Sequence, residues 1–304
     1  MKWISNSCGC GANGGSHVFD TYDYNFKNTL EKCSVFRCMV CGSLYPEVFP
    51  AKESLQNVYN NYYTIPKRRL GVRCLLRKLV DLTRKHYMLR GSPRYADTIL
   101  DYGCGSGEFL SLLNCEGFDA VLYGTDIFKP SDAVNMVFEW LPLDLLDKFE
   151  RRYDWITMNH VIEHLASVAP ILTQLANVTS RNGSIWISTP NADSILIKCF
   201  KGFARDIDFP RHRQIFSKKA LKEELMRVGF NVSFLSPPRI NVILNFNSCV
   251  KNIWECGEKT SLKKAQVIIL AGIRMALHLL LPKQIRDQEA PELVLVGSLE
   301  INVK

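Results

Sequence analysis

Residues 99–110 have the sequence ILDYGCGSGEFL, and this stretch decides the fold. Ile99 and Leu100 are typical of a buried strand, glycines alternate with other residues in the following turn, and apolar residues with helical spacing begin at Phe109. Because glycine has no Cβ, its backbone takes positive φ angles and a ligand can lie directly against it. A strand that enters a helix through such a turn directs backbone N–H groups and the positive end of the helix dipole at one place. The sequence therefore predicts a ligand site outside the carboxyl end of this strand.

The spacing of the glycines distinguishes this turn from a dinucleotide fingerprint. That fingerprint needs Gly-x-Gly-x-x-Gly, with the last glycine at the start of the helix. Here Asp101 stands two residues before a Gly-x-Gly-x-Gly run, which is formed by Gly103, Gly105 and Gly107. A second acid, Asp126, ends the next predicted strand, where a carboxylate can accept hydrogen bonds from both hydroxyls of a ribose.

The run from Ile99 to Leu110, taken with Asp126, resembles the first two motifs of class I S-adenosylmethionine-dependent methyltransferases. The resemblance implies an α/β, Rossmann-like fold with a seven-stranded, mostly parallel sheet whose last strand is antiparallel, and it implies S-adenosylmethionine (SAM) as cofactor. It also implies that Asp101 fixes the turn or meets the amino group of the cofactor, and that Asp126 binds the ribose. The cofactor-binding set that we expect is Asp101, Gly103, Cys104, Gly105, Gly107, Asp126, Ile127, Glu139, Asn159 and His160.

Strands and helices alternate through most of the chain after residue 97. The predicted strands are 98–102, 120–126, 138–142, 153–159, 184–189, 230–235 and 293–303. The predicted helices are 106–115, 143–149, one from His160 to about Arg181, and one from Ser217, as its cap, to Gly229. Short links between such elements predict a parallel sheet with right-handed crossovers and helices on both faces.

Length and composition bound the domain organisation. The 304 residues are 47% hydrophobic and 22% charged, which is typical of a soluble globular enzyme. We expect a cysteine-rich, zinc-ribbon-like unit at 1–50, a linker with a basic amphipathic helix at 51–96, and a methyltransferase domain at 97–304. An apolar, partly helical insertion is predicted within that domain at about 238–290.

The net charge of +8 favours acidic partners, namely phosphorylated substrates, nucleic acid or an anionic membrane surface, although ordinary surface solvation explains it equally well. The basic helix at 67–90 either contacts a membrane surface or a polyphosphate, or covers the sheet with a solvated outer face, which we favour. No apolar run reaches the ~20 residues of a membrane span. Without a charged-then-apolar leader, we expect a cytoplasmic protein, with peripheral membrane contact left open.

The chain has eleven cysteines, and four of them have a spacing that suggests a metal site. Cys38 and Cys41 form a Cys-x-x-Cys-Gly turn, while Cys8 and Cys10 form a Cys-x-Cys pair with an unusual spacing. Two such pairs separated by a loop predict a tetrahedral zinc site, and Cys33 is an alternative fourth ligand. An arm with buried or free thiols is the other interpretation. A unit this small would need the metal to stay folded.

Histidines are predicted near the reacting centre. His160 follows the fourth strand, and Arg211 and His212 follow the fifth, so chain topology places them over the same edge of the sheet. Methyl transfer requires the acceptor to be held against the methyl group, and a hydroxyl acceptor must also lose a proton. Histidine suits that step near neutral pH. We therefore expect His160 or His212 to act as the base, and Arg211 or Arg213 to hold a phosphate of the acceptor.

The acceptor is suggested by a second resemblance. Residues 159–165, 208–217 and 229–230 resemble methyltransferases encoded with bacterial surface-polysaccharide or secondary-metabolite sugar pathways, which often carry a cysteine ribbon. This implies a nucleotide- or lipid-linked sugar as acceptor.

Two alternative functions stay open. One is a metal-dependent RNA 2′-O-methyltransferase, because Glu163 and His164, with His160 before them and His212 later in the chain, resemble the metal site of that family. The other is a non-catalytic binding module that recruits partners through the cysteine ribbon.

Overall fold

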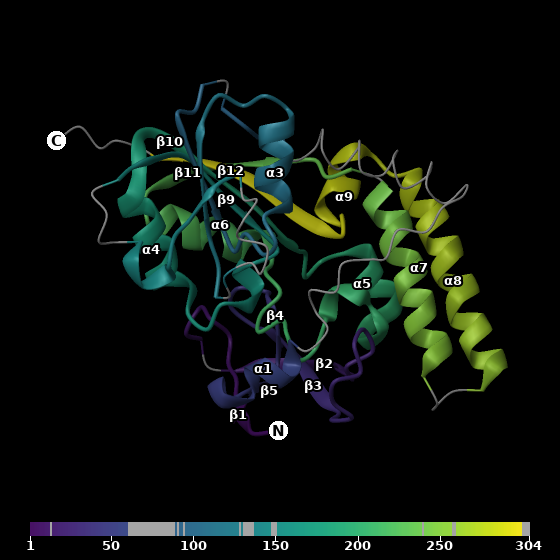
Figure 1. Ribbon diagram of the computed structural model, residues 1–304. Helices are drawn as coiled ribbons and strands as arrows, with labels where there is room; N and C mark the ends of the chain where they lie inside the picture. Colours follow the sequence, from purple (N-terminus) through teal and green to yellow (C-terminus); the bar gives the residue numbers. More distant parts are fainter. Residues whose placement is uncertain are drawn as a thin grey trace. The chain divides into compact units, whose positions relative to one another are not determined.

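The computed structural model describes residues 1–12, 14–59, 89, 91–93, 95–127, 129, 137–146, 151–238, 240–256 and 260–299 (Figure 1). The chain divides into two compact units. The N-terminal unit comprises Met1–Thr64, Pro190–Leu221 and Ser236–Leu293, and the sheet unit comprises Ile65–Thr189, Lys222–Leu235 and Val294–Lys304. Apart from Leu89, the basic helix predicted at 67–90 lies outside the described residues.

The sheet unit confirms the predicted α/β fold. In the described part of the chain, its strands are β6 (Thr98–Tyr102), β7 (Val121–Thr125), β8 (Glu139–Trp140), β9 (Tyr153–Asn159), β10 (Thr179–Pro190), β11 (Phe230–Leu235) and β12 (Glu292–Leu299). They form one seven-stranded sheet in the order β11-β12-β10-β9-β6-β7-β8. The pairs from β10 to β8 are parallel, and β12 is antiparallel to β11. The glycine turn after β6 therefore leaves the middle of the sheet at the carboxyl edge of the parallel strands.

The helical segments that connect these strands include α3 (Glu108–Cys115), η3 (Leu143–Leu145), η4 (Ile162–His164), α4 (Val168–Val178) and α6 (Lys218–Arg227), the last of which precedes β11. The prediction of one continuous helix from His160 to Arg181 is wrong. His160 has a φ of +55°, and Leu165 and Ser167 are extended, so a short 3-10 turn precedes a separate α4. The helix also ends at Val178, because Thr179 already belongs to β10.

The core of the sheet unit explains why its strands have almost uninterrupted apolar sequences. Trp155 of β9 is fully buried, and its ring packs edge-on against Phe109 of α3 and stacks with Phe118. Ile99 and Leu122 belong to the same cluster of buried side chains. Strands of a parallel sheet are covered on both faces, so both sets of side chains must be apolar.

The N-terminal unit combines three parts of the sequence. Its strands are β1 (Trp3–Ser5), β2 (Gly15–Thr21), β3 (Cys33–Cys38), β4 (Leu44–Pro46) and β5 (Val48–Pro50). β2, β3 and β4 form an antiparallel sheet, and β1 pairs with β5. Its helical segments are η1 (Lys52–Ser54), α1 (Leu55–Val58), α5 (Ile195–Phe200), η5 (Lys201–Phe203), η6 (Arg205–Ile207), α7 (Ile240–Glu255), α8 (Ser261–Leu279) and α9 (Lys283–Gln288).

The strands of the first fifty residues share one core with helices from much later in the chain. Phe19, Val35 and Leu44 pack in a single buried cluster with Leu196 of α5 and Met275 of α8. A segment of this size has little apolar area of its own to bury. It therefore takes its core from the helices that the sequence analysis described as an insertion.

A buried ion pair joins the start of the N-terminal unit to the segment after η6. Arg211 is fully buried and donates to both carboxyl oxygens of Asp208, at 3.0 and 2.9 Å, and to Asp23 Oδ1 at 2.5 Å. Its guanidinium also lies 4.3 Å from the ring centroid of Phe26. These contacts engage the nitrogens that the sequence analysis assigned to a substrate phosphate, so Arg211 has a structural role here.

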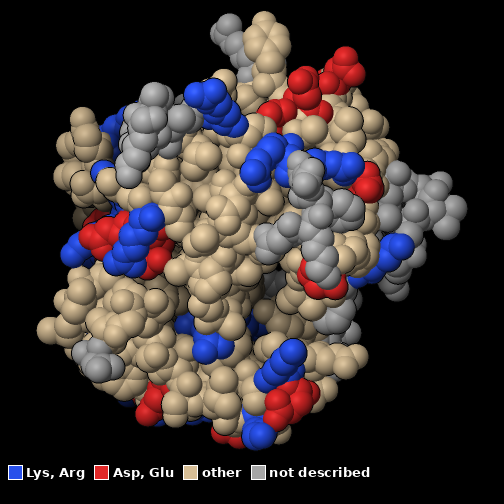
Figure 2. Space-filling model, turned by 90° about the vertical axis from the view of Figure 1, so that its left-hand side faces the viewer, with Lys and Arg blue, Asp and Glu red and all other residues tan. Residues whose placement is uncertain are grey.

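No helix among the described residues is long and apolar enough to cross a membrane. On the face drawn in Figure 2, basic and acidic side chains are interspersed among neutral ones. Among the described residues drawn on that face, the basic side chains do not form one broad surface.

Replacing Arg211 by methionine should lower the free energy of unfolding by about 3–5 kcal/mol, because two buried carboxylates lose their partner. Arg205→Met, whose side chain is 51% exposed, should cost less than about 1 kcal/mol and serves as the control. Burial raises the pKa of Asp208, but Arg211, His212 and the hydrogen bond from Asn25 together outweigh burial and hold this pKa below its usual value. That stabilisation is present above about pH 4 and is lost as the pH falls further. Urea unfolding at pH 7 and pH 3.5 measures both effects, and an Arg211→Met protein as stable as Arg205→Met at pH 7 would contradict them.

Candidate functional site

The glycine turn is held against the end of the neighbouring strand. Gly103 and Cys104 donate their backbone N–H groups to Thr125 O of β7, at 2.7 and 3.0 Å. Gly103, Gly105 and Gly107 have φ angles of +81°, +54° and +80°, as predicted for a turn that needs glycine.

Close packing gives two of these glycines a second reason to lack a side chain. A Cβ on Gly103 would lie 2.3 Å from Cγ2 of Val161, and a Cβ on Gly107 would lie 2.3 Å from Cε1 of Phe138. Since carbon atoms do not approach so closely, any larger residue would displace these neighbours. Phe138 is itself buried in the core of the sheet unit.

Asp126 connects the two predicted cofactor motifs directly. Its Oδ2 accepts a hydrogen bond of 2.8 Å from the backbone N–H of Gly105, and its side chain is partly exposed. The carboxylate at the end of β7 is thereby fixed beside the turn that follows β6. This is the geometry that a ribose-binding acid requires, since the sugar must lie next to the glycines.

Asp101 is a buried carboxyl group at the end of β6. Its Oδ1 accepts a hydrogen bond of 2.7 Å from Thr157 Oγ1 of β9. Burial, with a smaller contribution from the nearby charge of Asp126, raises the pKa of Asp101 to about 7, although the hydrogen bond from Thr157 acts in the opposite direction. An ammonium group placed beside this carboxyl would favour its ionised form, so the site suits a ligand that carries a cationic amino group.

The other predicted cofactor residues lie at the same edge of the sheet but differ in exposure. The thiol of Cys104 belongs to the buried core, which leaves only its backbone at the turn. Ile127 is 74% exposed and follows Asp126 directly. Glu139 of β8 is exposed and forms an ion pair of 3.6 Å with Arg151. Asn159 ends β9, in register with Ser188 of β10.

His160 is held in an unusual conformation at the end of β9. Its backbone N–H donates to Ser188 O at 2.8 Å, and its φ of +55° is rare for a residue with a side chain. Its Nδ1 lies 3.1 Å from Glu163 Oε1, and Glu163 Oε2 accepts a hydrogen bond of 2.9 Å from Thr189 Oγ1. Glu163 is fully buried, so both of its oxygens are fixed within a chain of polar contacts.

The sequence analysis missed the two hydroxyls that support this site. Thr157 lies opposite Asp101 in the parallel register of β9 and β6, and Thr189 comes from β10. The strand period of two marks Thr157 as sharing a face with Asn159, but only the strand register reveals which acid it contacts.

His212 belongs to the N-terminal unit, whereas His160 belongs to the sheet unit. His212 is nearly buried, with Nδ1 at 2.8 Å from Asp206 O and Nε2 at 3.9 Å from Asp208 Oδ2. Its ring also lines a small apolar cavity with Val35 and Phe209.

The N-terminal unit brings the four predicted thiols together. The sulfur atoms of Cys8, Cys10, Cys38 and Cys41 all lie within 4.8 Å of one another, with 3.3 Å between Cys8 and Cys41 and 3.6 Å between Cys10 and Cys38. Tetrahedral zinc with bonds of about 2.3 Å places sulfurs about 3.8 Å apart, so this donor set fits the metal. Cys33 is buried outside the group, with its thiol 3.5 Å from Ser34 O.

A glycine with positive φ follows each pair of cysteines. Gly11 donates its N–H to Cys8 O at 3.1 Å, and Gly42 donates to Cys38 O at 3.0 Å. Both glycines have a φ of +76°. The shorter Cys-x-Cys pair thus forms a turn similar to that of the Cys-x-x-Cys pair. A hydrogen bond from Cys8 lowers the pKa of the Cys41 thiol to about 4, which favours a thiolate ligand.

Solved structures similar to this chain include several methyltransferases. A SAM-dependent methyltransferase from Archaeoglobus fulgidus has 19% identity and a TM-score of 0.46, covering 73% of this chain and 94% of that one. The plantazolicin methyltransferase BpumL has 17% identity and a TM-score of 0.46, covering 83% and 92%. A SAM-dependent methyltransferase from Thermotoga maritima has 13% identity and a TM-score of 0.45, covering 82% and 97%. No curated protein matches the sequence.

The family is established by the sequence rather than by these distant structures. A protein-family model described as a methyltransferase domain matches residues 72–233, which is more than half of the chain. The match includes the glycine turn, Asp126 and the segment around His160. The chain belongs to the methyltransferase-domain family, and it is a SAM-dependent methyltransferase.

Proposed function

We propose that this protein transfers the methyl group of SAM to a hydroxyl of a nucleotide- or lipid-linked sugar. The hydrogen bond between Gly105 and Asp126 carries the cofactor part of the proposal, because it fixes a ribose-binding carboxylate beside the glycine turn. The linked side-chain contacts of His160 with Glu163 and of Glu163 with Thr189 support the choice of a hydroxyl acceptor. They hold a base, His160, at the end of β9.

The residues around the turn divide the binding of the cofactor between them. Asp126 binds the ribose hydroxyls, Asp101 faces the amino group, and the glycines allow close approach of the backbone. When bound, SAM supplies an electrophilic methyl group on a sulfonium. The buried environment of Asp101 makes its carboxylate a strong partner for a cation, since charges interact more strongly away from water.

His160 is the proton acceptor in this mechanism. Because Nδ1 lies beside the Glu163 carboxylate, the ring proton is held at Nδ1 and Nε2 takes the proton of the acceptor hydroxyl. Glu163 then stabilises the imidazolium that forms. Thr189 holds the second oxygen of Glu163 and so prevents the carboxylate from rotating away. His212 stays an alternative base that a parallel substitution can test.

The sugar acceptor rests on the resemblance of residues 159–165, 208–217 and 229–230 to sugar-pathway methyltransferases, and on the positive net charge, which suits a phosphorylated substrate. We also propose that the four clustered thiols bind a structural zinc ion, which would stabilise strands β2, β3 and β4. Thiolate ligation of this kind is typical of a reducing compartment, which supports a cytoplasmic location.

Asp126→Ala should weaken binding of S-adenosylhomocysteine by about 1.5–3 kcal/mol, the value of a hydrogen bond to a charged group. Asp119 is an exposed acid in the same unit, and Asp119→Ala should bind as the wild type does. Isothermal titration calorimetry measures both affinities. An unchanged dissociation constant for Asp126→Ala would remove its assignment to the ribose.

Labelled SAM should methylate a nucleotide sugar or a lipid-linked sugar without any added divalent cation.

His160→Gln should lower the turnover number about 10²–10⁴-fold, because the base is lost. His17→Gln, which changes an exposed strand position, should leave the turnover number unchanged. Labelling of short RNA that requires a divalent cation would instead support the RNA alternative. Cofactor binding without any transfer would support the binding module.

The purified protein should contain roughly one zinc ion per chain. Cys38→Ser should lose the metal and lower the thermal midpoint, because a ligand of the four-thiol group is removed. Cys33→Ser changes a buried cysteine outside that group and should retain the metal. Atomic emission spectroscopy with thermal unfolding tests this, and equal zinc content in the two variants would exclude the proposed ligand set.

A further inference from the structure

Helix α8 exposes a face of large aliphatic side chains. Its residues on this face have exposed fractions between 53% and 71%, and Leu280 at its end is 82% exposed. The face consists of Leu262, Ile269, Leu270, Ile273, Leu277 and Leu280. These positions recur at intervals of three, four or seven residues, apart from the adjacent pair at 269 and 270, so they form one continuous stripe along the helix.

The opposite side of α8 is already used by the core. Ala271, Met275 and His278 are buried there, and the first two pack against side chains of α5 and α7. The helix is therefore apolar on two sides, which is the pattern of a helix that is covered all round. α7 lies beside α8 and adds exposed apolar side chains, among them Ile243 and Trp254 (Figure 1).

The charged side chains of α8 are all basic. Residues 261–279 contain lysine, arginine and histidine but no acidic residue. Lys263 and Arg274 each follow directly on an aliphatic residue of the stripe, Leu262 and Ile273. Because successive helix residues lie about 100° apart, both cations flank the apolar face.

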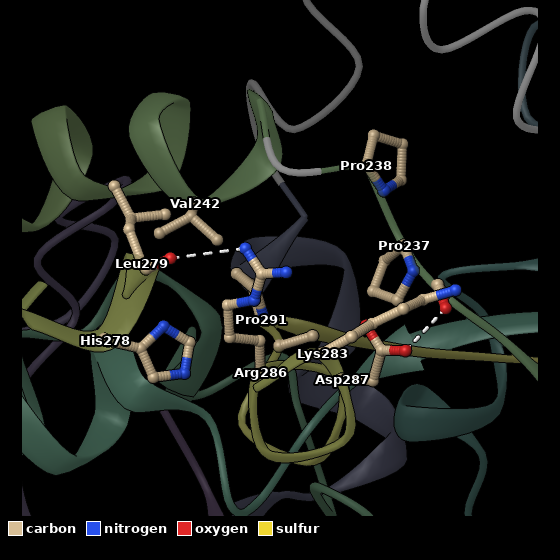
Figure 3. A pocket seen from close by; sticks show the side chains of 11 residues that line it. Pro237, Pro238, Val242, His278, Leu279, Lys283, Arg286, Asp287 and Pro291 are labelled. Carbon is tan, nitrogen blue, oxygen red and sulfur yellow. Dashed lines mark hydrogen bonds between the residues drawn. The ribbon is translucent and has the colours of Figure 1, made fainter. Parts of the chain in front are cut away.

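Further cations follow the end of the stripe. Lys283 and Arg286 of α9 line a cavity of about 90 Å³ together with His278 (Figure 3). Arg286 Nη1 donates to Leu279 O at 3.3 Å, and the only acid in the lining, Asp287, accepts a hydrogen bond from Ser236 Oγ. These two cations follow the stripe in the sequence, but the cavity that they line lies on the side of α8 that carries the buried His278.

We propose that the apolar face of α8, flanked by Lys263 and Arg274, docks onto the surface of an anionic lipid bilayer. The helix would lie in the plane of the interface, with its aliphatic side chains among the acyl chains and its cations at the phosphate groups. This inference rests on the proposed function in one respect, namely that a lipid-linked sugar would be presented at such a surface.

Charge favours a bilayer over a second copy of the chain. In a two-fold interface with the two α8 helices antiparallel, the cation-bearing flank of one helix would meet the same flank of the other. An anionic surface instead neutralises Lys263 and Arg274 and adds attraction to the burial of the aliphatic side chains.

The test is co-sedimentation of the full chain with phosphatidylcholine vesicles that contain or lack 30% phosphatidylglycerol. The wild type should bind the anionic vesicles at least about tenfold more tightly than the neutral ones. Ile269→Gln/Ile273→Gln/Leu277→Gln should weaken that binding roughly tenfold or more. A matched variant, Leu30→Gln/Val121→Gln/Met226→Gln, changes exposed aliphatic residues elsewhere and should bind as the wild type does. Lys263→Glu/Arg274→Glu should lose most of the preference for anionic lipid.

Two results would overturn the inference. One is no binding of the wild type to anionic vesicles, or equal binding by the two glutamine variants. The other is a dimer in sedimentation analysis that only the α8 variant dissociates, with no vesicle binding, which would identify a second copy as the occupant. Calorimetric titration with S-adenosylhomocysteine separates the two proposals. A wild-type protein that does not bind this ligand would contradict the proposed function but would not affect the conclusion from vesicle binding.

Discussion

The hydrogen bond from the Gly105 N–H to the Asp126 carboxylate is the contact on which the cofactor site depends. It joins the turn after β6 to the end of β7, and the carboxyl ends of these neighbouring strands lie at the same edge of the sheet because the strands are parallel. The backbone N–H groups of Gly103 and Cys104 reinforce the junction by donating to Thr125 O. A carboxylate that would otherwise rotate freely is thereby fixed before any ligand binds, which reduces the entropy that binding costs.

Much of the sheet could be predicted from sequence alone, because its strands have compact apolar runs with clear ends. The bounds of β6, β9 and β11 agree with the predicted strands. The segment after β9 could not be predicted, since an apolar pattern with helical spacing does not reveal the positive φ at His160 that interrupts it. The extra residues at the start of β10 were missed for a similar reason, because Thr179 and the residues after it are polar and resemble a loop.

Part of the candidate site could be predicted from local sequence patterns, whereas other contacts in it depend on the tertiary structure. The glycines and both acids are close in sequence, so their grouping was predictable. The contact of Asp101 with Thr157 depends on strand register across 56 positions, which no local pattern contains. Arg211 looked like a phosphate ligand because it is a cation in a loop after the sheet. Only its contacts with Asp23 and Asp208 reveal that its charge is used within the unit.

The most direct test of the cofactor site is a crystal structure with bound S-adenosylhomocysteine. We expect the ribose hydroxyls to lie within hydrogen-bond distance of Asp126, the amino group to face Asp101, and the ligand to contact the backbone of Gly103 and Gly105. A structure in which this turn is empty while the ligand occupies another place, or in which Asp126 faces away from it, would contradict the account.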